Sequence, residues 1–191
     1  MKKGRLEAFS DGVIAVIITI MVLELHVPHS GHLRDLAPML PAFLSYVLSF
    51  LYVGIYWNNH HHMLYVVEKI NGAALWANLN LLFWLSLIPF VTEWMEENHF
   101  STGPVALYGL ILIMNALAYT ILSRVLIRGA GNNTALAEAM GSDRKGYLSL
   151  AIYACAIPLS FVSSVAALCL YWAVAVIWFI PDPRIERRVK K

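Results

Sequence analysis

Charged residues are scarce in this chain. Asp, Glu, Lys and Arg make up 14% of its 191 residues, whereas soluble domains carry about 25%. Apolar residues make up 59% of the chain, and the mean hydropathy is +0.64. The composition therefore excludes an ordinary soluble domain and predicts an integral membrane protein.

The chain also lacks the motifs of enzymes and of disulfide-rich proteins. It contains no nucleophile elbow, phosphate-binding loop or paired-carboxylate site, so we expect neither catalytic residues nor a cofactor. Its two cysteines, Cys155 and Cys169, fall in apolar segments, where a structural disulfide is not expected. Lys2, Lys3 and Arg5 precede a long apolar stretch without a small-residue cleavage site, which argues against a cleaved signal peptide.

Long apolar segments fill most of the sequence. A bilayer core needs roughly 20 residues per helical span, so the chain has room for about six spans with short loops and for no separate soluble domain. The polar, Gly-rich interval 128–146 is predicted to be the longest loop, and the last two spans divide near Ser163 and Ser164. We expect one all-helical transmembrane domain over residues 1–191, with spans at about 7–26, 40–64, 73–94, 104–127, 147–162 and 164–181.

Basic residues gather on one side of this predicted topology. An even number of spans places both termini on the same side, and 13 of the 14 Lys and Arg residues fall there, all except Arg34. The opposite side carries Asp35, Glu93, Glu96 and Glu97. The positive-inside rule then predicts that both termini face the cytosol. A nucleic-acid or lipid-binding patch is the alternative interpretation of the basic tail; a topological anchor is the simpler one, and we expect no nucleic-acid partner.

The first span carries polar side chains inside an otherwise apolar run. Ser10 and Asp11 lie about one turn inside the predicted helix, Thr19 is the single polar residue of the interval 12–23, and no charge follows until Glu24. An ionisable group inside a membrane is costly and usually functional. Successive side chains on a helix point in directions that differ by 100°. Residues spaced three or four apart therefore form one stripe along this helix, and Asp11 points nearly to the opposite face. The stripe consists of Arg5, Phe9, Gly12, Val16, Ile20 and Leu23, with Thr19 at its edge.

The opening of this helix, residues 5–11, reads R-x-x-x-F-S-D. The pattern resembles the signature that opens the first transmembrane helix in the transmembrane-protein-175 family of potassium channels. In that family the first helix lines the pore, and its bulky aliphatic side chains form the constriction. Counted from the F-S-D element, the narrow positions fall on Val16, Ile20 and Leu23, and the threonine implicated in ion preference falls on Thr19. Without the resemblance, contact of the stripe with lipid or with neighbouring helices is the simpler interpretation.

The resemblance also implies how the chain assembles and what it conducts. Family members with two six-span repeats work as dimers, so this single-repeat chain is expected to form a homotetramer around a central pore. Valine at position 16 stands where isoleucine or leucine is more usual, so we expect a wider ring there. Aliphatic rings can close such a pore by dewetting. Single-repeat members are prokaryotic, which implies a prokaryotic plasma membrane and contact with its lipids.

The sequence lacks the T-V-G-Y-G filter of ordinary potassium channels. We therefore expect passive, potassium-preferring conduction of monovalent cations, with modest selectivity from the narrow apolar passage and the Thr19 hydroxyl. Glu24 lies just beyond the constriction and, with the acidic outer loops, would raise the cation concentration at the outer mouth.

A polar layer is expected near the cytosolic ends of the first three spans. Ser10 and Asp11 in the first span, Trp57 and His60 in the second and Asn78 in the third fall at similar depth. Trp57-x-x-His60 and this asparagine also resemble the family pattern. Buried polar groups in lipid need partners, which favours a structural layer that holds the first helix. The alternative is a proton relay through Asp11 and His60, as in a transporter.

Two other hypotheses follow from the same residues. A metal site is suggested by the run His60 to His62, but consecutive helical residues diverge by 100° and cannot chelate one ion, so none is expected. The main functional alternative is a small proton-coupled secondary transporter that uses Asp11 and His60, although the chain shows no evident internal repeat or pair of broken helices. A scaffold or assembly factor is a third class.

Overall fold

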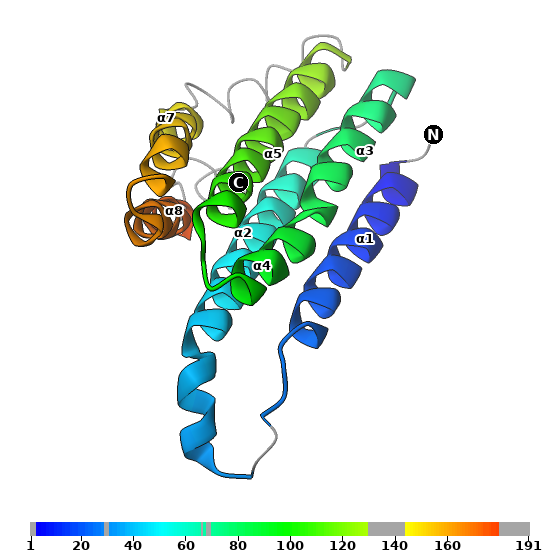
Figure 1. The fold of residues 1–191 in the computed structure, drawn as a ribbon. Helices are drawn as coiled ribbons and strands as arrows, with labels where there is room; N and C mark the ends of the chain where they lie inside the picture. The colour runs from blue at the N-terminus through cyan, green and yellow to red at the C-terminus, as the bar shows by residue number, and fades with distance from the viewer. Residues whose placement is uncertain (1–2, 29–30, 66, 68–69, 130–143, 180–191) are drawn as a thin grey trace.

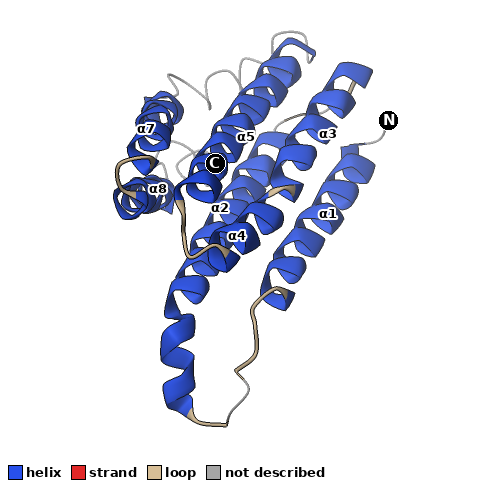
Figure 2. Cartoon of the chain, in the orientation of Figure 1, coloured by secondary structure: helices blue, strands red, loops and turns tan. Residues whose placement is uncertain are grey.

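The computed structural model describes residues 3–28, 31–65, 67, 70–129 and 144–179, and these residues form helices joined by short connections (Figures 1 and 2). The predicted all-helical architecture is confirmed for this part of the chain. Most of the predicted loop at 128–146, together with Lys69 and the basic tail, lies outside the described residues. The elements are α1 (Lys3–Leu23), the 3₁₀ helix η1 (Leu33–Met39), α2 (Leu40–Tyr65), α3 (Gly72–Ser86), α4 (Ile88–Glu97), α5 (Thr102–Gly129), α7 (Arg144–Ser160) and α8 (Ser164–Phe179).

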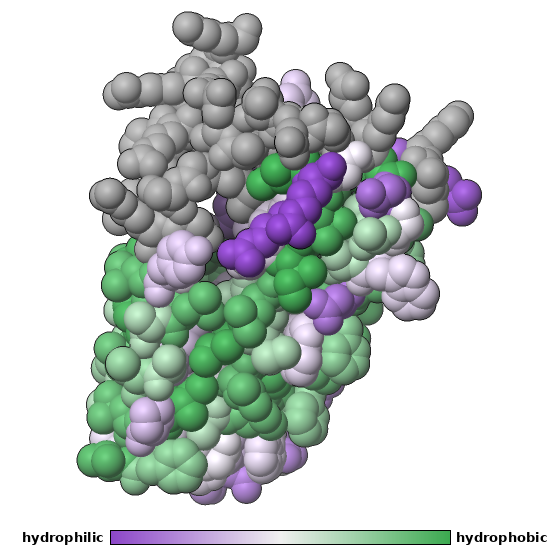
Figure 3. Space-filling view, turned by 90° about the horizontal axis from the view of Figure 1, so that it is seen from above, coloured by the Kyte–Doolittle hydropathy of each residue, from purple (hydrophilic) through white to green (hydrophobic). Residues whose placement is uncertain are grey.

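Four of the described helical segments are long and apolar enough to cross a membrane. They are Lys3–Leu23, Leu33–Tyr65, Gly72–Glu97 and Thr102–Gly129. At 1.5 Å per residue, the 16 residues of α8 extend about 24 Å, less than a hydrocarbon core of about 30 Å. Viewed from the end where α1 begins, much of the described surface is hydrophobic, and hydrophilic residues occur in small groups (Figure 3).

The third long segment is interrupted at Leu87, which ends α3 and precedes α4. Pro89 has no N–H group, so the helical hydrogen-bond ladder cannot continue unbroken across this point. The Asn115 side chain of α5 compensates in part, because its Nδ2 donates to the Trp84 carbonyl at 3.3 Å and to the Ile111 carbonyl at 2.9 Å. The sequence prediction treated 73–94 as one span; the structure divides it into two helices that can differ in direction.

One side of the bundle is built around buried tyrosines. The Tyr52 hydroxyl of α2 donates to the Tyr171 carbonyl of α8 at 2.7 Å, and the Tyr153 hydroxyl of α7 donates to the Tyr52 hydroxyl at 3.2 Å. The Tyr171 hydroxyl donates to the Val105 carbonyl of α5 at 3.2 Å. These contacts join α2, α5, α7 and α8, and the sequence analysis did not identify them.

Helix α1 lies at the other edge of the bundle (Figure 1), where it packs against α2, α3 and α4. Its buried residues, all on one face, are Leu6, Ser10, Ile14, Ile17 and Met21. Within the described chain no other helix covers the opposite face of α1.

Candidate functional site

The predicted stripe of α1 lies on the face that the chain leaves uncovered. The exposed fractions are 55% for Val16, 40% for Ile20 and 78% for Leu23, and Phe9 is 53% exposed. A Cβ atom at Gly12 would meet no atom within 4 Å. Large apolar side chains exposed in one row on a single helix mark a surface that needs a partner, whether lipid or protein.

Thr19 is exposed on the same face of α1. Its hydroxyl donates a hydrogen bond to the Val16 carbonyl of the preceding turn, with an oxygen–oxygen distance of 2.9 Å. A hydroxyl that donates its proton still has acceptor lone pairs. The Thr19 oxygen can therefore still face a cation or a water molecule.

The buried face of α1 is tied to two other helices by a chain of hydrogen bonds. The Asn78 Nδ2 of α3 donates to the Ser10 Oγ at 2.9 Å, and the Asn78 Oδ1 lies 2.7 Å from the His60 Nε2 of α2. An amide oxygen only accepts, so His60 donates from Nε2. All three side chains are buried, with exposed fractions of 2% or less. This chain joins α1, α2 and α3 at one level.

Asp11 takes part in a separate pair. The Trp57 Nε1 of α2 donates to the Asp11 Oδ1 at 2.9 Å, and both side chains are exposed. The Trp57 ring also stacks on His61, with centroids 6.1 Å apart. Asp11 and His60 therefore have different hydrogen-bond partners.

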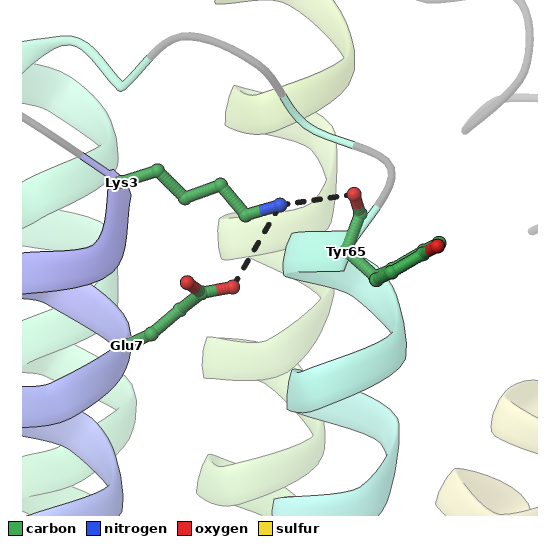
Figure 4. A network of polar contacts seen from close by, with 3 residues as sticks. All are labelled: Lys3, Glu7 and Tyr65. Carbon is green, nitrogen blue, oxygen red and sulfur yellow. Dashed lines mark hydrogen bonds and ion pairs between the residues drawn. The ribbon is translucent and has the colours of Figure 1, made fainter.

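A third contact, at the start of α1, was not anticipated from the sequence. The Lys3 Nζ donates to the Tyr65 carbonyl at the end of α2, 2.9 Å away, and lies 3.7 Å from the Glu7 Oε1 (Figure 4). A cation near the last carbonyls of a helix interacts favourably with the helix dipole. The spacing of Lys3 and Glu7 along the helix was a usable signal for the ion pair, whereas the Tyr65 contact depends on how α1 and α2 pack. Arg5 of the R-x-x-x-F-S-D motif is exposed.

A groove of about 800 Å³ runs along α1 beside the break between α3 and α4. Stripe residues such as Val16 and Ile20 form one wall, and Pro89 and Phe90 form the other. Glu24 and Glu93 lie at one end. The sequence analysis missed this groove because it depends on the position of α4.

Comparisons with known proteins identify the family and the fold. The family described as "Endosomal/lysosomal potassium channel TMEM175" matches residues 5–89. A potassium channel of Chryseobacterium sp. (strain P1-3) is 57% identical over 191 residues, which cover 100% of both chains. The crystal structure of a lysosomal potassium-selective channel TMEM175 homolog from Chamaesiphon minutus superposes with a TM-score of 0.79 at 26% identity, over 93% of this chain and 96% of that one. The human endosomal/lysosomal proton channel TMEM175 is 34% identical over 96 residues, or 44% of this chain and 19% of the human one.

Proposed function

The chain belongs to the TMEM175 family of potassium channels, and we propose that it conducts potassium passively through a central pore lined by α1. The observation that carries the proposal is the division of α1 into two faces. One face is buried and hydrogen-bonded to α2 and α3, and the other presents exposed aliphatic side chains in a row. A helix held in this way can present a fixed row of side chains to a pore.

The aliphatic row acts as a hydrophobic gate in this proposal. Rings formed by Val16, Ile20 and Leu23 would narrow the passage, and an apolar constriction closes by dewetting. The Thr19 hydroxyl supplies an oxygen at the same level as the gate, so it contributes to the preference for potassium. Glu24 follows Leu23 directly and attracts cations to the outer mouth.

The pore requires several copies of the chain. A single α1 cannot enclose a channel, and rotational symmetry supplies the missing walls. We propose a homotetramer, in which four α1 helices surround the axis. The exposed stripe then faces the pore instead of lipid.

The ends of the described helices support a cytosolic location for the N-terminus, and an even number of spans would place the C-terminus on the same side. Helix α1 begins and α5 ends at the same end of the bundle (Figure 1), so Lys3, Arg5, Arg124 and Arg128 gather there. Arg34 in η1 lies at the opposite end. The positive-inside rule favours the basic end as the cytosolic one, in the plasma membrane of a prokaryote.

The hydrogen-bond pattern favours a structural role for the polar layer over a proton relay. A relay through Asp11 and His60 needs a proton path between them, yet His60 is bonded to Asn78 and Asp11 to Trp57. Each polar group has a partner that fixes a helix. We therefore place the proton-coupled transporter second.

Cysteine accessibility in liposomes tests the pore helix. In a background with Cys155→Ser and Cys169→Ser, which removes the two exposed native thiols, Leu23→Cys is treated with a charged, membrane-impermeant thiol reagent during potassium flux. We expect the reagent to block flux, because a charge bound in an aliphatic constriction is unfavourable. The matched control is Ile121→Cys on α5, which is 49% exposed and faces lipid in this proposal, so its flux should not change.

The same liposomes separate the functional classes. A channel passes potassium down any gradient, a transporter saturates and couples potassium to protons, and a scaffold does neither. Equal block at Leu23→Cys and Ile121→Cys would place the pore elsewhere. Because vertebrate relatives are described as proton channels, a proton-sensitive dye in the vesicles should also be used to measure proton permeation.

A further inference from the structure

Two pairs of side chains join the far end of α1 to α4. Glu24 and Glu93 both line the groove and bring their carboxyl groups together at its end. Two residues beyond Glu24, the His26 Nδ1 lies 3.7 Å from the Glu96 Oε1. Neither pair belongs to the polar layer or to the aliphatic row, but Glu24 is the residue that follows Leu23.

Both pairs depend on protons. An ionised carboxylate only accepts hydrogen bonds, so Glu24 and Glu93 can bond to each other only while one of them holds a proton. When both are ionised, the two like charges repel. His26 attracts Glu96 only while the imidazole is protonated. A fall in pH therefore strengthens the attraction within both pairs, and a rise in pH weakens it.

The charged groups around Glu93 reinforce this behaviour. Glu24 and His26 act on it from the end of α1, and Glu97 acts on it from α4 itself. With three carboxylates and one histidine close together, the charge at this end of the groove becomes more negative as the pH rises. The resulting repulsion acts between the end of α1 and α4 and increases with the pH.

We propose that the Glu24–Glu93 and His26–Glu96 pairs form a proton-controlled clasp that sets the position of the end of α1, and with it Leu23, relative to α4. Helix α4 is suited to move, because the break at Leu87 and Pro89 separates it from α3. Beside the break, the Oδ1 of Asn115 is buried and has no hydrogen-bond partner within the described part of the chain. One buried side-chain acceptor is therefore left unsatisfied beside the break.

The first test measures the clasp without reference to conduction. Glutamine can hydrogen-bond to a carboxylate without a titrating proton, so Glu93→Gln should keep the pair closed at every pH. In detergent we expect this variant to melt about 2–4 °C above the wild type at about pH 8, and the difference should vanish at about pH 5. Glu24→Gln should give the same shift, and the double variant no more than either.

The matched control for this test is Glu97→Gln, which removes an equal charge from α4 without touching Glu24. We expect it to give less than half of the shift and to add to that of Glu93→Gln. Equal shifts for Glu93→Gln and Glu97→Gln, or no difference between wild type and Glu93→Gln at either pH, would overturn the clasp.

The second test links the clasp to Leu23, and only this part rests on the proposed function. Potassium flux of the wild type should change with the pH on the side of the membrane where Glu24 lies, and Glu93→Gln should weaken this dependence, because only the His26–Glu96 pair still titrates. A pH-dependent melting difference with an unchanged flux profile would disprove the link to Leu23. Absence of potassium flux at every pH would contradict the proposed function, while the melting experiment would still decide whether the clasp exists.

Discussion

The two sides of this bundle are stabilised in different ways. Around α2, α5, α7 and α8, tyrosines are buried on all sides and hydrogen-bond to one another or to backbone carbonyls. Helix α1 is instead held by apolar packing of one face and by a few polar contacts from Lys3, Ser10 and Asp11 in its first half. The first arrangement suits a region that must be rigid. A helix that must present side chains to something outside its own chain needs the second.

The tyrosine side illustrates how close packing limits substitution. The Tyr108 hydroxyl bonds to Ser49 at 3.0 Å, and Ser49 bonds to Thr92 at 2.7 Å. The Thr92 hydroxyl donates to the Ile88 carbonyl. Ser49 therefore donates to Thr92, and Tyr108 donates to Ser49. Each member is satisfied, so replacing one disturbs the others.

The largest effect on stability is expected on the tyrosine side, at Gly109 of α5. A methyl group there would overlap the Tyr171 hydroxyl and lie 2.9 Å from the Ile157 Cγ1. Gly109→Ala should lower the free energy of unfolding by about 1–3 kcal/mol or more, measured by thermal unfolding in detergent. The matched control is Gly54→Ala in α2, where a Cβ meets nothing within 4 Å and the higher helix propensity of alanine should make the change neutral or mildly stabilising. Similar losses at both glycines would mean that contact with Tyr171 and Ile157 is not what limits substitution at Gly109.

The polar layer should show the next largest effect. His60→Ala leaves the Asn78 Oδ1 without its hydrogen-bond donor, and Asn78→Ala leaves both Ser10 and His60 unsatisfied. Each substitution should cost about 1–3 kcal/mol, and the double variant should cost less than the sum because the residues share one bond. Asp11→Ala should combine additively with His60→Ala, since their partners differ. Stable variants that lose only proton-coupled uptake would instead favour the transporter.

The open face of α1 should respond in conduction more than in stability. Ile20→Asn and Leu23→Asn place a polar group in the proposed constriction and relieve dewetting. Basal potassium flux should rise by about tenfold or more, the change produced by lowering a barrier by about 1.4 kcal/mol, and potassium-to-sodium selectivity should fall. Ile121→Asn on the exposed face of α5 serves as the control and should leave both unchanged. If the α1 variants behave like this control, their side chains contact lipid.

The smallest effect is expected at Thr19. Thr19→Val keeps the shape of the side chain and removes the oxygen that could face a cation. The potassium-to-sodium permeability ratio should fall by about two- to fivefold, which corresponds to less than about 1 kcal/mol, while the assembled protein and its melting temperature stay the same. An unchanged ratio would mean that the hydroxyl serves only its bond to the Val16 carbonyl.

Parts of the candidate site could be read from the sequence because they depend on one helix. The stripe from Phe9 to Leu23 follows from the 100° rotation per residue, and the structure places those side chains on one exposed face. The similar depth of Ser10, His60 and Asn78 follows from the order and direction of the spans. Which of these residues bond to one another does not follow, because depth along an axis says nothing of rotation about it. His60 bonds to Asn78, while Asp11 turns to Trp57.

The sequence by itself determined the membrane character, the helical segments and the stripe, since composition and periodicity are local properties of the chain. The tertiary structure decided the groove between α1 and α4, the meeting of Glu24 with Glu93 and the contact of Lys3 with the Tyr65 carbonyl. It also decided how the break at Pro89 is supported, because Asn115 is distant in sequence and reaches Trp84 only when α5 packs against α3. Such contacts depend on how helices are rotated and tilted against one another, and many weak packing interactions distributed over the whole bundle set those angles.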